Sequence, residues 1–286
     1  MDLSPAQIDD FLTQGYLVID NFFSRETCEQ LMQRMDCLIA ANKDSMTTAI
    51  FSTRTNEHAA SRYFLESGDK IHFFFEPDAF NPDGTLVQAL ERSLNKVGHA
   101  LHELDPIFSQ YSHDPRIQSI CRQLGFKMPC LLQSMYIFKQ PAIGAEVNCH
   151  QDATYLHSEQ GDVLGFWFAL EDATLENGCL QVIPSPHHTP LRQKMIREND
   201  GIYVEEYDKT PWPEEHCVPL EVKQGSLILL HGHVPHKSNA NASSKSRHAY
   251  TLHAVDASLP YPQSNWLQRA NGLPLWPQKT RIEETI

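Results

Sequence analysis

The 286-residue sequence lacks the features that mark several large classes of protein. The longest apolar stretch near its middle, residues 165–170, is far shorter than the roughly 20 residues that span a bilayer. No Lys/Arg-rich segment occurs, and a net charge of −13 repels nucleic-acid phosphates and anionic lipid surfaces. We therefore expect neither nucleic-acid nor membrane partners.

Targeting and disulfide signals are also missing. The first five residues lack the basic and apolar regions of a signal peptide, and the last three do not match the peroxisomal Ser-Lys-Leu address. The seven cysteines are an odd number, widely spaced, with no Cys-x-x-Cys pair, which is typical of reduced thiols used as small core residues. A cytoplasmic location is the expectation.

Two common catalytic motifs are absent as well. The sequence contains no Gly-x-Gly, which disfavours dinucleotide enzymes, and no Gly-x-Ser-x-Gly, which disfavours a serine hydrolase elbow. What is present is an ordinary globular composition, with 41% hydrophobic and 21% charged residues. Without repeats or a convincing linker, we expect a single domain over 1–286.

The first 125 residues predict a mostly helical segment that braces the rest. Ser4 and Pro5 form a helix start that Gly15 ends, and Ser24 caps a second helix. A short strand is expected over 16–19 between them. Further segments are a loop or weak helix over 43–62 and helices over 86–104 and 115–124.

Residues 126–260 predict a β-rich core. Apolar and aromatic runs indicate strands over 130–139, 164–170, 179–183, 221–222, 226–231 and 247–255. Asn177-Gly178 is typical of a hairpin turn. Strands at this spacing after a helical third favour an antiparallel sandwich or barrel braced by helices. The proline-containing and charged stretch 190–217 predicts a long insertion between strands, a segment type that often forms an active-site lid.

His150-Gln151-Asp152 is the first candidate metal motif. In an extended strand, residues two apart face the same side, so this imidazole and carboxylate could converge on one ion. The motif is weak alone, because 15 His and 36 acidic residues in 286 give about two His-x-acid triplets by chance. A second triplet, His157-Ser158-Glu159, is indeed present.

A distant histidine cluster adds the missing ligand. The apolar strand 227–230 runs into His231, His233 and His236, and any of the three could bind a metal. His236 begins the more informative run, because Ser238 and Arg247 follow it. On a hairpin with 239–244 in the turn, these residues would line one pocket. Their ordinary alternatives are an exposed salt bridge for the arginine and a turn hydroxyl for the serine.

This combination of residue types suits one particular chemistry. Two neutral imidazoles and one carboxylate leave Fe(II) three open positions on one face. A 2-oxo acid fills two of them and O2 takes the third. The distal carboxylate of the acid then needs a planar, permanently charged fork, which arginine supplies better than lysine, and a nearby hydroxyl adds a donor.

At these residues the sequence resembles the phytanoyl-CoA dioxygenase family, over nearly the whole chain. The stretches that carry the resemblance are Ser67-Gly68-Asp69-Lys70-Ile71, Gln133-Ser134-Met135-Tyr136-Ile137-Phe138-Lys139-Gln140-Pro141, His150-Gln151-Asp152-Ala153, residues 171–180 and His236-Lys237-Ser238. The resemblance implies a mainly β fold with supporting helices, whose core is a double-stranded β-helix of the jelly-roll or cupin-like type.

The same resemblance implies the site and the reaction. It assigns Fe(II) to His150, Asp152 and His236, and 2-oxoglutarate to Lys96, Met135, Trp167, Ser238 and Arg247. A dioxygenase of this kind consumes O2, hydroxylates a small organic substrate and releases succinate and CO2, with ascorbate as a supporting reductant. Three of the residues have structural alternatives, a solvated helix position for Lys96, core packing for Met135 and strand packing for Trp167.

Two other functions remain open at this point. A catalytically silent sensor of metal or 2-oxoglutarate would use the same ligands, and a Zn²⁺ hydrolase could use two His and one Asp. The family often shows Pro-Gly-Ser-His where this chain has Pro184-Ser185-Pro186-His187, so we expect this loop to follow a different path and to reshape the substrate mouth. Neither the substrate nor the oligomeric state can be inferred from the sequence.

Overall fold

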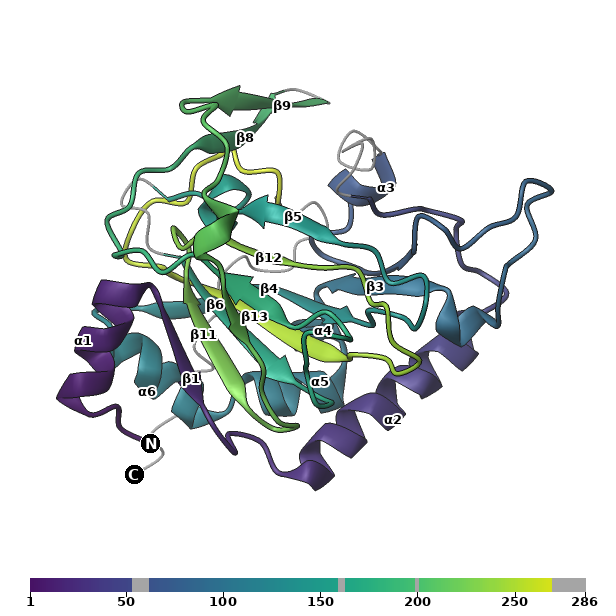
Figure 1. The fold of residues 1–286 in the computed structure, drawn as a ribbon, viewed down its shortest axis with the longest axis horizontal. Coiled ribbons are helices and arrows are strands. Elements are labelled where there is room, and N and C mark those ends of the chain that lie inside the picture. The colour runs from purple at the N-terminus through teal and green to yellow at the C-terminus, as the bar shows by residue number, and fades with distance from the viewer. Residues whose placement is uncertain (53–61, 159–162, 199–200, 269–286) are drawn as a thin grey trace, which may run out of the picture.

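Two antiparallel sheets form the centre of the computed structural model, which describes residues 1–52, 62–158, 163–198 and 201–268 (Figure 1). The larger sheet has seven strands in the order β1-β11-β6-β13-β4-β3-β2, and the smaller has four in the order β10-β7-β12-β5. The large-sheet strands are β1 Tyr16–Ile19, β2 Ile71–Phe75, β3 Leu94–His99, β4 Pro129–Ile137, β6 Val163–Ala169, β11 Leu227–His231 and β13 Ala249–Asp256. The small-sheet strands are β5 Val147–His150, β7 Leu180–Val182, β10 Val218–Leu220 and β12 His236–Ser238.

The chain moves back and forth between these sheets. From β4 to β7, each successive strand joins the opposite sheet, and the same alternation runs from β10 to β13. This winding is the double-stranded β-helix, so the predicted fold class is confirmed. The insertion between β7 and β10 forms a separate two-stranded ribbon of β8 Gln193–Glu198 and β9 Gly201–Glu206, followed by a 3₁₀ turn, η4 Glu214–His216.

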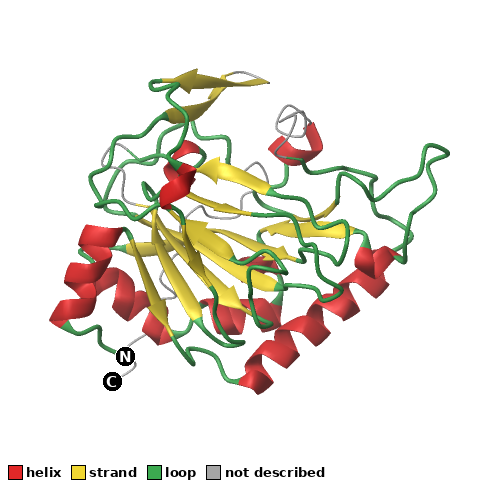
Figure 2. Cartoon of the chain, in the orientation of Figure 1, coloured by secondary structure: helices red, strands yellow, loops and turns green. Residues whose placement is uncertain are grey.

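Helices cover one face of the large sheet (Figure 2). They are α1 Pro5–Gln14, α2 Arg25–Asn42, α4 Leu101–Leu104, α5 Pro106–Ser112 and α6 Pro115–Gln123, whereas the short helix α3 Arg62–Leu65 lies apart from them, with its Phe64 lining the cavity described below. The predicted starts are present, since Ser4 makes a full capping box and Ser24 accepts a hydrogen bond from the Thr27 backbone N–H. Among the described residues, no helix combines the length and apolar character needed to cross a membrane.

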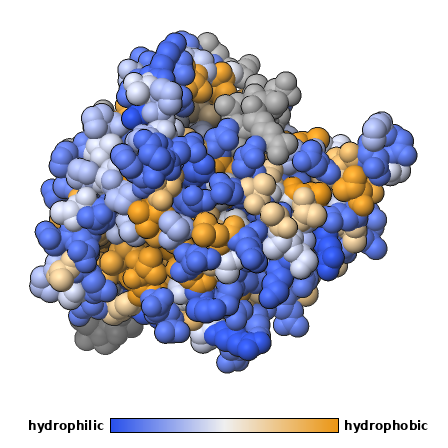
Figure 3. All heavy atoms as spheres, in the orientation of Figure 1, coloured by the Kyte–Doolittle hydropathy of each residue, from blue (hydrophilic) through white to orange (hydrophobic). Residues whose placement is uncertain are grey.

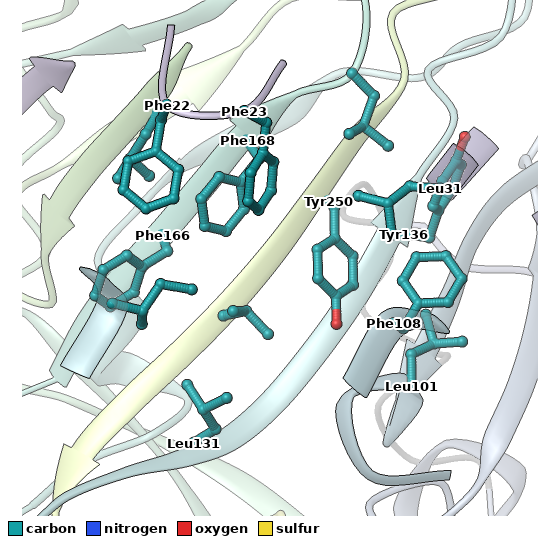
Figure 4. Close-up of a cluster of buried hydrophobic side chains, with 14 of the residues drawn as sticks. Phe22, Phe23, Leu31, Leu101, Phe108, Leu131, Tyr136, Phe166, Phe168 and Tyr250 are labelled. Carbon is teal, nitrogen blue, oxygen red and sulfur yellow. The ribbon is translucent and has the colours of Figure 1, made fainter. Parts of the chain in front are cut away.

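The main hydrophobic core lies between these helices and the large sheet. Phe166 and Phe168 of β6 and Tyr250 of β13 pack there against Phe108 of α5 and Phe23 (Figure 4). Because side chains alternate across a strand, the residues between them face the opposite side, toward the small sheet. The space between the helices and the large sheet is therefore a packed core, whereas the space between the two sheets holds a smaller hydrophobic cluster and also a cavity. The face in Figure 3 is mostly hydrophilic, interrupted by a few apolar patches.

The helix predicted over 86–104 is wrong. This range contains a single 3₁₀ turn, η2 Leu90–Arg92, then strand β3 and the four-residue helix α4. Strand β3 pairs with β2 on one side and β4 on the other, so tertiary pairing decides its conformation. Lys96 consequently lies in the middle of a sheet.

Both predicted hairpins are also wrong. The Asn177-Gly178 turn connects β6 to β7, and the segment 239–244 connects β12 to β13, so each joins strands of different sheets. Gly178 has φ +81°, and a Cβ on it would lie 2.6 Å from the Asn239 carbonyl oxygen. The backbone conformation thus requires glycine at position 178. A turn does not, however, determine which strands the segments on either side of it will pair with. The strand expected over 221–222 reduces to one bridge between Val222 and Ala173.

Candidate metal and cosubstrate site

Three side chains from separate segments meet between the two sheets. His150 ends β5 and lies directly opposite His236, which begins β12. Asp152 opens a 3₁₀ turn, η3 Asp152–Thr154, so the continuous strand predicted through 150–152 is not formed. One ligand atom from each of the three residues lies within 4.8 Å of the others.

The hydrogen bonds of the two histidines prepare them to bind a cation. Nδ1 of His150 lies 2.8 Å from the Asn148 carbonyl oxygen, and Nδ1 of His236 lies 3.1 Å from that of Val234. A carbonyl only accepts, so both Nδ1 atoms carry the proton and both Nε2 atoms present a lone pair. These lone pairs lie 3.5 Å and 3.6 Å from Asp152 Oδ1. Three electron-rich atoms facing one another fit a divalent cation.

The pKa values of His236 and Asp152 are shifted toward the ionisation states that a metal requires. Burial lowers the pKa of His236 to about 4, so its imidazole is neutral at neutral pH. Burial alone would raise the pKa of the Asp152 carboxyl, but His236, His253 and His150 together hold it well below its ordinary value. Metal ligands must be deprotonated, and both pKa shifts favour that form for His236 and Asp152.

A cavity of about 530 Å³ extends from the three side chains across the floor of the large sheet. The five residues predicted to contact 2-oxoglutarate all line it: Lys96 of β3, Met135 of β4, Trp167 of β6, Ser238 of β12 and Arg247 just before β13. In the sheet, Met135 and Trp167 flank Thr251 of β13 in register. Lys96 and Arg247, which are 151 positions apart in the chain, thus line the same cavity.

Two buried cationic side chains, Arg247 and Lys96, line the cavity without an acidic hydrogen-bond partner in the part of the chain that the structure describes. Arg247 is only 2% exposed, and its Nε and Nη1 atoms have no hydrogen-bond partner among the described residues. Its guanidinium carbon lies 5.0 Å from the Trp167 ring centre. Burial lowers the pKa of Arg247 to about 10, so the charge is retained at neutral pH. Since an isolated buried charge is costly, this end of the cavity fits an anion.

Lys96 strengthens this positive end. Its Nζ lies 3.2 Å above the Phe51 ring centre, and burial lowers the pKa of the amine to about 7. Glu76, which is fully buried beneath the cavity, opposes this shift through its charge. The exposed helix position considered for Lys96 is therefore excluded.

The other predicted candidates lie outside the metal cluster. Nδ1 of His231 faces the backbone N–H of His233 at 3.2 Å, and Nδ1 of His233 lies 2.6 Å from the Thr189 carbonyl oxygen. Of the triplet at 157–159, His157 is buried away from the cavity, and its acidic member lies outside the described residues. The loop 184–187 packs against α1 and does not line the cavity, so the expectation that it reshapes the mouth is wrong.

Two residues of the site were missed by the sequence interpretation. His253 of β13 lies 3.2 Å from Asp152 Oδ2 through its Nε2. Counting by twos from Arg247 along the predicted strand would have placed it on the same face. Gln151 is 1% exposed and donates to the carbonyls of Pro190 and His233 while accepting from the Arg192 N–H. No local pattern predicts that Gln151 makes these hydrogen bonds, because its partners are 39 to 82 residues away.

Solved structures with the same fold include iron enzymes. The epimerase SnoN in complex with Fe3+, alpha ketoglutarate and nogalamycin RO superimposes with a TM-score of 0.64 at 15% identity, covering 94% of this chain and 90% of that one. EctD from S. alaskensis with bound Fe gives a TM-score of 0.63 at 18% identity, covering 94% of this chain and 82% of the other. At this identity, the likeness concerns the fold.

Sequence relatives are much more similar. A phytanoyl-CoA dioxygenase of Arabidopsis thaliana is 45% identical over 269 residues, which covers 94% of each chain. Phytanoyl-CoA dioxygenase domain-containing protein 1 of Mus musculus is 43% identical over 285 residues, covering 96% of this chain and 98% of the relative. The family model for phytanoyl-CoA dioxygenase matches residues 11–249, and the chain therefore belongs to the phytanoyl-CoA dioxygenase family.

Proposed function

We propose that the protein is an Fe(II)- and 2-oxoglutarate-dependent dioxygenase that hydroxylates a small organic substrate and releases succinate and CO2. The observation that carries the proposal is that one cavity is lined both by the His150–Asp152–His236 cluster and by Arg247, whose Nε and Nη1 have no hydrogen-bond partner among the described residues. The cluster fits a ferrous ion with open positions, and the guanidinium fits the far carboxylate of a five-carbon diacid.

Each part of the cavity has a distinct role in this function. Ferrous iron held by His150, Asp152 and His236 would activate O2 for oxidative decarboxylation of 2-oxoglutarate and hydroxylation of the substrate. Arg247 binds the distal carboxylate through its planar fork, and the Ser238 hydroxyl lies on the same strand face as His236. Met135 and Trp167 wall the space between and exclude water from it. Lys96, whose pKa burial lowers to about 7, adds positive charge to this cavity in its protonated form.

Succinate formation from 2-oxoglutarate tests the proposal directly. Purified protein is loaded with Fe(II) without oxygen, mixed with 2-oxoglutarate and ascorbate, and then exposed to O2. We expect succinate and CO2, and none when iron or O2 is omitted or when Asp152→Ala replaces the wild type. Protein that binds 2-oxoglutarate without forming succinate would be a sensor, and hydrolysis that persists without oxygen and depends on Zn²⁺ would indicate a hydrolase.

The substrate class needs a separate experiment. Protein isolated without oxygen is denatured, and the small molecules released are identified by mass spectrometry. A compound that accelerates succinate formation and gains one oxygen atom is the expected result. Succinate formation that no released compound accelerates would mean that the bound molecules are not substrates.

A further inference from the structure

The two oxygens of the Asp152 carboxylate have different surroundings. Oδ1 faces the Nε2 atoms of His150 and His236, at 3.5 Å and 3.6 Å. Oδ2 points away from the cluster and lies 3.2 Å from Nε2 of His253. The carboxylate therefore presents one oxygen to the metal position and the other to the large sheet.

His253 has the opposite tautomer to the two ligand histidines. An ionised carboxylate attracts an N–H and repels a ring lone pair, so the 3.2 Å approach to Oδ2 favours a proton on Nε2 of His253. The same atom therefore has no lone pair to offer a metal, in contrast to Nε2 of His150 and His236. His253 also has a buried Nδ1 with no hydrogen-bond partner among the described residues, and the Asp152 carboxylate is the acid that faces its Nε2.

The sheet holds this imidazole in a fixed place. His253 lies on β13 in register with Gln133 of β4 and Gly165 of β6, and its side chain is 8% exposed. Gly165 also shapes the position of the carboxylate, because a Cβ there would lie 3.1 Å from Asp152 Oδ2. The glycine thus opens the space in which Oδ2 reaches the histidine.

We propose that His253 is a positioning residue that restricts Asp152 to binding the metal through Oδ1 alone. The inference rests on the proposed metal site and adds a reason why its open face stays open. A carboxylate free to rotate could bind through both oxygens and occupy a position that the 2-oxo acid or O2 requires. The close contact of His253 Nε2 with Oδ2 opposes that rotation from the side of the sheet.

Metal affinity, measured with Co(II) and without turnover, tests this role. The variants are His253→Leu, which removes the donor, and His253→Gln, whose amide N–H can still reach Oδ2. His102→Leu is the matched control, because His102 is a buried imidazole outside the cavity whose Nδ1 lies 2.9 Å from the Ser134 hydroxyl. We expect His253→Leu to weaken Co(II) binding by about 10–100-fold, and His253→Gln by less than about 10-fold.

The control and a second variant separate positioning from general damage. His102→Leu should lower the melting temperature but leave the Co(II) dissociation constant within about twofold, because no ligand moves. Gly165→Ala leaves His253 intact but crowds Oδ2 from β6, and should weaken Co(II) about tenfold. In His253→Leu, the visible spectrum of bound Co(II) should also change, as the second carboxylate oxygen becomes a ligand.

The outcomes distinguish the two proposals. Wild-type affinity and an unchanged Co(II) spectrum in folded His253→Leu, verified by circular dichroism, would overturn the positioning role. If that variant does not fold, wild-type Co(II) affinity in Gly165→Ala overturns it instead. A wild-type protein that binds no Co(II) or Fe(II) would overturn the proposed function itself.

Discussion

The cationic side chains of the cavity differ in whether an acidic side chain of the same protein pairs with them. At the inner end, Arg247 and Lys96 are buried, and Arg247 has unpartnered donors. At the mouth, the cations are paired within the chain, as Arg192 is with Asp208 at 3.3 Å. Lys209 with Glu206 and Lys237 with Glu214 are further pairs there. A cation that the fold has already neutralised stabilises the fold, whereas one left without an acid is available to a ligand.

The largest expected effect comes from the proposed metal ligands, which line the same cavity. His236 and His233 are three residues apart, but only His236 belongs to the metal cluster. His236→Ala should lower Fe(II) or Co(II) affinity more than about 100-fold, beyond the 10–100-fold typical of residues that only support ligands. His233→Ala should cost less than about 10-fold. Anaerobic metal titration of both variants checks the difference, and equal losses would mean that the wrong histidine has been assigned.

The next effect contrasts the two ends directly. Arg247 is the buried guanidinium among the described residues that line the cavity, and Arg247→Gln removes it. The KM for 2-oxoglutarate should rise by about 30- to 1000-fold, as expected for losing one partner of a buried charge pair. Arg192→Gln at the mouth should change that KM less than about threefold, because its charge already pairs with Asp208. Succinate assays over a range of 2-oxoglutarate concentrations measure both. A larger effect at Arg192 would reverse the assignment of the two ends.

These contrasts show what the sequence could and could not predict. The residue types and spacing at His150, Asp152 and His236 predict a metal site, because ligand chemistry is set by side-chain identity. They could not reveal that Asp152 leaves the strand, since that depends on packing around η3. The turn at Gly178 was predicted from local backbone preference, but its strands join different sheets through contacts far along the chain.

Lys96 illustrates the same limit. Its segment was expected to be helical, and only its pairing with β2 and β4 makes it a strand that faces the cavity. By contrast, the capped helices were predicted nearly to the residue, because Ser4 and Asp114 act on backbone N–H groups within their own turns. Local signals thus predicted local structure, and the site required the long-range pairing as well.

A smaller effect concerns the buried, neutral imidazole of His231, which does not line the cavity. Burial, with His233 and His187 nearby, lowers the pKa of His231 to about 3. The unfolded chain takes up a proton near pH 6.5 and the folded chain does not, so the free energy of unfolding falls as the pH drops from about 6.5 toward 3. His231→Gln removes this contribution. As the pH drops, the free energy of unfolding of the variant should therefore fall less steeply than that of the wild type, by up to about 1.4 kcal/mol per pH unit. Urea unfolding at several pH values measures the slope, and parallel curves would exclude the effect.

The smallest effects come from comparing a buried set of hydrogen bonds with an exposed ion pair. Gln151→Leu removes three hydrogen bonds that join the metal-ligand segment to the insertion and to the loop before His236, and should cost about 1–3 kcal/mol in the free energy of unfolding. Lys209→Gln removes a pair whose lysine is 79% exposed and should cost less than about 1 kcal/mol.

Limited proteolysis resolves where the Gln151 effect acts. Because Pro190 and Arg192 lose their partner in Gln151→Leu, cleavage within 190–217 should become faster in that variant, but not in Lys209→Gln. Metal affinity should fall less than in His253→Leu, since Gln151 holds backbone atoms and does not touch the carboxylate of Asp152. Unchanged cleavage together with a large loss of metal would show that Gln151 supports the ligands rather than the insertion. In that case the ion pairs, rather than Gln151, would hold the insertion 190–217 in place.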